Sequence, residues 1–174
     1  MVPSITQQLE SMRHRFAETV LPALSADAEF AQEQAKLMLA TFDWLLDTHP
    51  YQYRYVVVEN SEYRNLLSDL VSLADAGVSR GLLEQARARL DEPGPAPDEA
   101  RTPLFELADQ TRRLKQLAMS IAAALQETDE RGAACDLVAS IARSQGAREL
   151  AFFRMTGFTQ GGHGLLSELD SHHE

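Results

Sequence analysis

The sequence of 174 residues contains a single cysteine, Cys135, and this scarcity excludes several kinds of stabilisation. One cysteine forms no intrachain disulfide and cannot by itself build a cysteine-based zinc site. Cys135 lies among small residues, and a free cysteine in such a setting is usually buried. We therefore expect it to pack as an inert small side chain, because the sequence places no base beside it that would activate the thiol.

Positive charge and long apolar runs are also scarce. Sixteen basic residues face 26 acidic ones, giving a net charge of −10. Non-specific binding to nucleic acid or to anionic membranes needs a basic face, so both partners are excluded. No apolar run approaches the roughly 18 residues of a membrane span, and the N-terminus lacks the features of a signal peptide. We expect a cytoplasmic protein, and the preference for arginine over lysine is typical of a GC-rich bacterial genome.

Familiar catalytic and metal motifs are absent as well. The sequence has no Gly-x-Ser-x-Gly, no His-Glu-x-x-His and no Glu-x-x-His. Four of the nine glycines fall within residues 157–164, but their spacing matches no phosphate-binding fingerprint and no lysine follows them. We expect neither a metal nor a cofactor.

What remains is a composition that favours helix. Leucine and alanine dominate, hydrophobic residues make up 44% of the chain, and isoleucine occurs only three times. Apolar residues recur at three- and four-residue steps, which predicts an all-α, single-domain bundle of five or six mostly antiparallel helices. The expected helices span residues 4–24, 28–48, 51 or 53–75, 79–90, 102–125 and 129–145.

Residues at the expected helix ends support these boundaries. Ser4 and Thr102 are suitable N-caps, and Pro103 suits a first helical turn. Pro22 should kink or end the first helix. The broad apolar face of the second helix, which includes Phe30 and Met38, suggests a central helix with several neighbours.

The predicted domain boundaries follow from the positions of the proline and glycine residues. A loop over residues 91–101 is rich in both and should connect two halves of one bundle, because each half alone would be small for an independent core. We expect one domain over residues 1–155 and a glycine-rich mobile tail over 156–174. Residues 150–155 fit either a helical turn or a short extended piece.

The candidate site is an aromatic segment. All four tyrosines lie between positions 51 and 63, just after the only tryptophan, Trp44. Tyrosine offers a large apolar area with a polar tip, which suits a binding surface. The segment alternates as a strand would, but its helical spacing extends further, so we predict a helix. The candidate ligand-binding residues are His49, Tyr51, Arg54, Tyr55, Glu59 and Tyr63.

Glu59 falls in the middle of the apolar face of this helix, and His49 falls on the apolar face of the preceding one. A buried carboxylate needs a partner or a raised pKa, so the two could pair as an acid and a base. The alternatives are a structural hydrogen-bonded pair or a glutamate at the edge of the apolar pattern. Arg54 and Arg64 are predicted on the exposed side, where they could hold an anion or simply form a solvated surface.

The sequence Val-Leu-Pro-Ala-Leu at 20–24, followed by Phe30, Ala35, Leu39 and apolar turns to Leu46, carries a family resemblance. Over about residues 20–46 the chain resembles an uncharacterised bacterial family of small helical domains. These domains occur beside or fused to aminoglycoside-phosphotransferase-like proteins of acyl-CoA metabolism. The resemblance implies an accessory helical module and supplies no catalytic residues.

These observations together predict an accessory or binding protein rather than an enzyme. It would act by protein–protein contact or by binding a small apolar or acyl ligand. Broad apolar faces in a small bundle exceed what one core needs, which predicts a homodimer. The alternative is a small enzyme that uses Glu59 and His49 as acid and base between helices.

Overall fold

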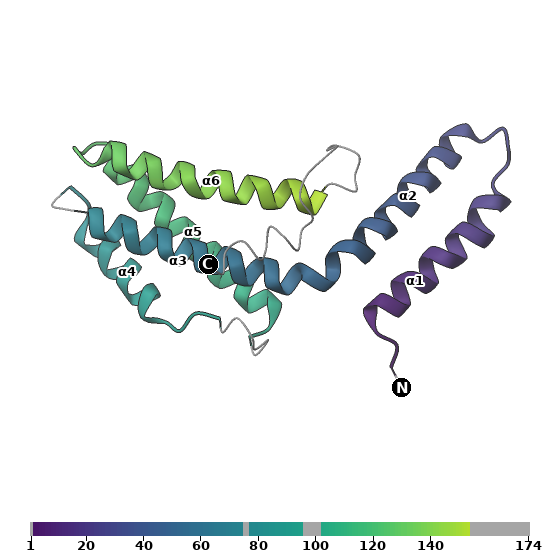
Figure 1. Ribbon diagram of the computed structural model, residues 1–174, viewed down its shortest axis with the longest axis horizontal. Coiled ribbons are helices and arrows are strands. Elements are labelled where there is room, and N and C mark those ends of the chain that lie inside the picture. The colour runs from purple at the N-terminus through teal and green to yellow at the C-terminus, as the bar shows by residue number, and fades with distance from the viewer. Residues whose placement is uncertain (1, 75–76, 96–101, 154–174) are drawn as a thin grey trace. The chain divides into compact units, whose positions relative to one another are not determined.

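The chain is all-α in a computed structural model, which describes residues 2–74, 77–95 and 102–153. No strand occurs among these residues, so the predicted fold class is confirmed (Figure 1). The α-helices are α1 (Ile5–Arg15), α2 (Glu29–Thr48), α3 (Gln52–Leu73), α4 (Arg80–Asp91), α5 (Leu104–Leu125) and α6 (Arg131–Phe153).

Contacts between residues divide the described chain into two compact units. The first comprises residues 2–52 and 149–153, and the second comprises residues 53–148. Each unit is described by itself. A single domain over residues 1–155 stays a prediction, and the tail over 156–174 lies outside the described residues.

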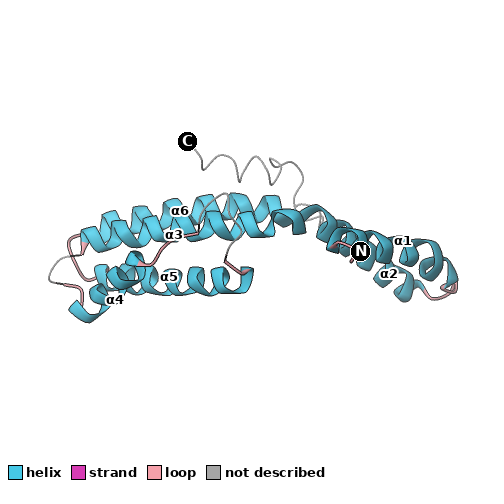
Figure 2. Cartoon of the chain, turned by 90° about the horizontal axis from the view of Figure 1, so that it is seen from below, coloured by secondary structure: helices cyan, strands magenta, loops and turns pink. Residues whose placement is uncertain are grey.

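The first unit is built on a hairpin of α1 and α2, which lie side by side (Figure 2). Ser4 caps α1 as predicted: its hydroxyl accepts from Gln7 N at 3.2 Å, while the Gln7 side chain accepts from Ser4 N at 2.9 Å. After α1 the chain forms a π-helical turn, Phe16–Val20, and a 3-10 turn, Leu21–Ala23. The α-helix therefore ends at Arg15, before Pro22, and the proline lies in the 3-10 turn that ends the whole helical stretch.

The two helices of the hairpin contact each other along their length. Phe16 packs on Phe42 with ring centroids 6.1 Å apart, and Arg13 forms an ion pair with Asp43. Even so, α1 has no buried residue, and α2 buries only Ala35 and Thr48. Within the described residues of the first unit, most of the apolar face of α2 is not buried, so the expected central position of this helix is not seen there.

The second unit holds the main hydrophobic core, formed by α3, α4, α5 and α6 (Figure 2). Helix α5 lies at the centre of this core, and its sequence shows the predicted apolar spacing of three and four residues. Every residue of that pattern from Leu107 onward is buried: Leu107, Thr111, Leu114, Ala118, Ile121 and Leu125. The pattern therefore predicted the buried face of this helix correctly.

Three local predictions need correction. The N-cap of α5 is Pro103 rather than Thr102, and it makes no side-chain capping bond. The last helix continues through Phe153 rather than ending at residue 145, because Gly146 is accommodated within α6. Cys135 is exposed rather than packed in the core, and its Sγ lies 3.5 Å from Nε2 of Gln126 at the end of α5.

Candidate functional site

The six predicted site residues are divided between the two units. His49 and Tyr51 lie in a 3-10 turn of the first unit, where His49 Nε2 and Thr6 Oγ1 are 3.0 Å apart. Arg54, Tyr55, Glu59 and Tyr63 lie on α3 in the second unit. The pairing of Glu59 with His49 stays a prediction, and each of the two side chains has a neighbour within its own unit.

On α3, Glu59 and Tyr63 meet through one residue of α6. Tyr63 is buried, and its hydroxyl donates to Gln145 Oε1 at 2.8 Å. Gln145 Nε2 in turn donates to Glu59 Oε1 at 3.4 Å. The Lys115 ammonium lies 5.4 Å from the centre of the Tyr63 ring. Glu59 is half-buried, as are Tyr55 and Arg54, so its carboxylate is held at the edge of the core.

One turn further along the same seam lies an ion pair that the sequence analysis missed. Arg148 of α6 is fully buried, and its guanidinium donates to both carboxylate oxygens of Glu62. Ser144 connects them, because its hydroxyl donates to Glu62 at 2.7 Å and accepts from Arg148 at 2.8 Å. Arg148 and Glu62 therefore form a buried ion pair between α6 and α3. The sequence pattern did not indicate that Arg148 is buried. Helix α6 has no clear apolar face, so the position of a single arginine within it does not predict burial.

Arg64 was predicted on a solvated surface, but it clamps the end of α4. Its guanidinium donates to the backbone carbonyls of Leu90 (3.3 Å), Glu92 (2.8 Å) and Pro93 (3.3 Å). A cation is favourable there, because the last carbonyls of a helix lack partners and carry negative charge. Burial lowers the pKa of Arg64 below its usual range.

Two further contacts fix the clamp. Arg64 Nε donates to Asn60 Oδ1 at 3.1 Å, and Asn60 Nδ2 donates to Thr111 Oγ1 at 3.0 Å. A Cβ on Gly94 would lie 3.2 Å from Arg64 Nε, so glycine allows the loop to approach the guanidinium closely. The cluster is therefore structural, and it joins α3, the end of α4 and α5.

Tyr53 is the remaining tyrosine, and it was not among the predicted site residues. Its hydroxyl is buried and has no hydrogen-bond partner among the described residues. Among all the described residues, no three His, Cys, Asp or Glu side chains come together as a possible metal site.

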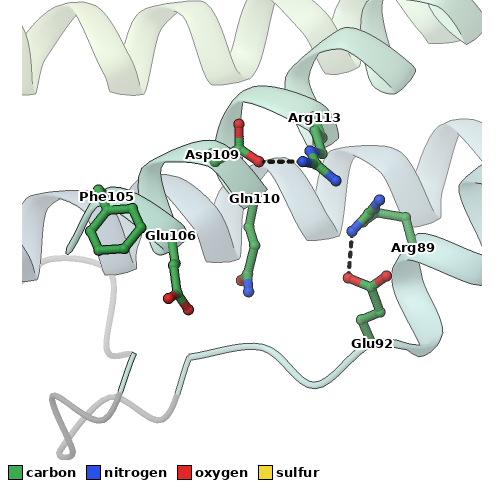
Figure 3. Close-up of a pocket in the computed structure, with 7 residues that line it drawn as sticks. All are labelled: Arg89, Glu92, Phe105, Glu106, Asp109, Gln110 and Arg113. Carbon is green, nitrogen blue, oxygen red and sulfur yellow. Dashed lines mark hydrogen bonds and ion pairs between the residues drawn. The ribbon is translucent and has the colours of Figure 1, made fainter. Parts of the chain in front are cut away.

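A surface pocket of about 480 Å³ lies between the end of α4 and the start of α5 (Figure 3). Its arginines are already engaged: Arg89 pairs with Glu92 at 2.5 Å and Arg113 with Asp109 at 2.7 Å. Asp109 and Arg113 are four residues apart, the spacing at which side chains meet on a helix surface. Because these cations are neutralised by neighbouring carboxylates, the pocket gives little support to anion binding.

The pKa of Asp109 gives a pH-dependent prediction. Arg112 donates to this carboxylate and, with Arg113, holds its pKa below the ordinary value of 3.8. A lowered carboxyl pKa stabilises the fold above the unfolded-state pKa, and this contribution is lost as the pH falls through the lowered folded value. Carbon-detected NMR titration of Asp109 should give a midpoint below 3.8. In Arg112→Gln the midpoint should rise, and an unchanged midpoint would contradict the assigned cause.

Fold and site together define an all-α helical bundle with a polar seam between α3 and α6 and an exposed apolar hairpin. Comparisons with family models, curated proteins and solved structures found no match to the chain. In the part of the chain that the structure describes, no helix has both the length and the apolar character needed to cross a membrane.

Proposed function

We propose that the protein is a non-enzymatic binding protein that acts by protein–protein contact through its α1–α2 hairpin. The proposal rests on the positions of the large apolar side chains that are exposed. Of the ten such side chains found among the described residues, eight lie in the first unit. They are Val2, Ile5, Met12, Val20, Phe30, Leu37, Met38 and Leu150.

The exposed residues follow rows along the hairpin helices. Ile5 and Met12 on α1 are 66% and 54% exposed, and Phe30 and Leu37 on α2 are 75% and 60% exposed. Each pair is separated by about two helical turns, so its members lie on one face. Met38, beside Leu37, is 49% exposed. We call these five residues the hairpin face. Rows of exposed large apolar side chains on both helices are unusual for a monomeric protein and are typical of a surface that binds a partner.

A second copy of the chain is the partner we propose for the hairpin face. A hairpin of two helices cannot enclose a core, whereas two hairpins packed face to face form a four-helix arrangement. The 20-residue helix α2 is about 30 Å long. Two packed helices are about 20 Å wide, so each copy could bury roughly 600 Å², which reaches the lower limit of specific dimers.

The enzyme alternative has less support. His49 contacts the Thr6 hydroxyl, and Glu59 accepts from Gln145, whose carbonyl also accepts from Tyr63. These contacts favour a structural role for both candidate catalytic groups. An accessory binding role also agrees with the family resemblance over residues 20–46.

Sedimentation equilibrium of the purified full chain tests the proposal. We expect a dimer, with Leu37→Glu weakening dimerisation at least about 30-fold, because a buried anchor at an interface contributes about 2 kcal/mol or more. The matched control is Phe105→Glu, since Phe105 is 73% exposed but lies on α5 in the second unit. A wild-type monomer at high micromolar concentration would contradict the dimer, and equal effects of both variants would contradict the hairpin face.

A further inference from the structure

A groove follows the seam between α3 and α6 in the second unit. It consists of two adjoining hollows of about 570 and 200 Å³, which share Asp69, Leu137 and Ser140. One hollow extends to Leu73 and Ala133, and the other extends to Glu62 and Ile141. Residue numbers rise along α3 as they fall along α6, so the groove separates two antiparallel helices.

The floor of the groove is apolar. Leu66, Leu73, Leu137 and Ile141 line it, and all but Leu66 are only partly buried. Partly buried aliphatic side chains still expose apolar area that a partner could cover. From Ala133 to Ile141 the α6 wall is about 12 Å long, which matches two turns of a third helix laid along the seam.

The rim carries negative charge. Glu62, Asp69 and Asp136 line the groove, and no lysine or arginine does. Glu62 is already paired with the buried Arg148. Asp69 and Asp136 are exposed, and neither has an ion pair among the described residues. Two carboxylates without an ion pair, one from each helix, therefore line the same hollow.

We propose that this groove is a second contact surface, and that its partner is an amphipathic helix with basic flanks. Apolar side chains spaced three and four residues apart would lie on the leucine floor, as in other helix-in-groove complexes. Lysine or arginine beside them would meet Asp69 and Asp136. The net charge of −10 would speed the approach of such a helix. This surface is independent of the hairpin face, because it lies wholly within the second unit.

The probe is a fluorescent synthetic helix built from leucine and lysine in an amphipathic pattern, titrated with the full chain at fixed ionic strength. We expect saturable binding that is weakened at least about tenfold by Asp69→Lys combined with Asp136→Lys, since rim charges set attraction to a charged partner. The matched control, Asp91→Lys with Glu106→Lys, makes the same charge change at exposed acids outside the groove. Equal weakening by both double variants would show non-specific attraction and overturn the proposal.

Two further measurements locate the bound peptide. Cys135 is the only cysteine, is exposed, and adjoins the groove residue Asp136 in sequence. A polarity-sensitive dye on Cys135 should therefore shift to shorter wavelength when the peptide binds. Leu37→Glu should leave this binding unchanged, which separates the groove from the hairpin face. Loss of binding in Leu37→Glu, equal binding of a leucine–glutamate peptide, or an unchanged dye spectrum would each contradict the groove.

Discussion

Arg148→Ala is expected to lower the free energy of unfolding by about 3–5 kcal/mol. Arg148 is fully buried, and the side chain of its partner Glu62 is only 14% exposed. Removing the guanidinium leaves a carboxylate with little hydration and without its main counter-charge, and it removes a donor to Ser144. Urea denaturation followed by circular dichroism measures the loss.

Matched variants separate the ion pair from simple truncation of a long side chain. Arg143→Ala removes the same side chain from an exposed position of α6 and should change stability by less than about 0.5 kcal/mol. Arg148→Met combined with Glu62→Leu should recover much of the loss, because replacing both charges with apolar groups leaves neither unpaired. A loss below 1 kcal/mol in Arg148→Ala would contradict the role of the buried pair.

The second large effect is expected for Leu114→Ala, which should destabilise the protein by about 2–5 kcal/mol. Leu114 lies in the middle of α5 and is fully buried within the main core. Truncation removes apolar contacts and leaves a cavity that the neighbouring helices can fill only in part. The size of the loss therefore reports how tightly the second unit is packed.

Leu150→Ala is the matched control, because Leu150 is 58% exposed on α6 and the same atoms are removed. Its effect should be below about 0.5 kcal/mol. Trp44, the only tryptophan, lies in the first unit, where its Nε1 donates to the Phe152 carbonyl at 2.7 Å. Its fluorescence follows that unit while circular dichroism follows the whole chain. Equal losses for the two leucine variants would contradict the assigned core.

The segments that form helices were well predicted, because the apolar spacing within each helix is a local property of the sequence. The capping of α1 by Ser4 and the buried row of α5 followed from neighbouring residues and were confirmed. Predictions that needed knowledge of neighbouring helices fared worse. Cys135 and Arg64 were both assigned by residue type, yet the thiol is exposed and the guanidinium clamps a helix end.

The candidate site shows the same division. The sequence indicated Tyr63 and Glu59 as residues on the inner side of a helix, and their helical spacing was enough for that. It did not indicate Gln145, which contacts both, because Gln145 is 82 residues from Tyr63 along the chain. A polar residue far away in sequence gives no periodic signal of the partner it will meet.

The sequence by itself determined the fold class, the order of the helices and the inward face of α5. These follow from side chains three and four residues apart, which interact through the geometry of a single helix. Only the tertiary structure decided that Arg148 is buried against Glu62, 86 residues away. It also decided that the apolar row of α2 is exposed, because the burial of a helix face depends on which other helices pack against it.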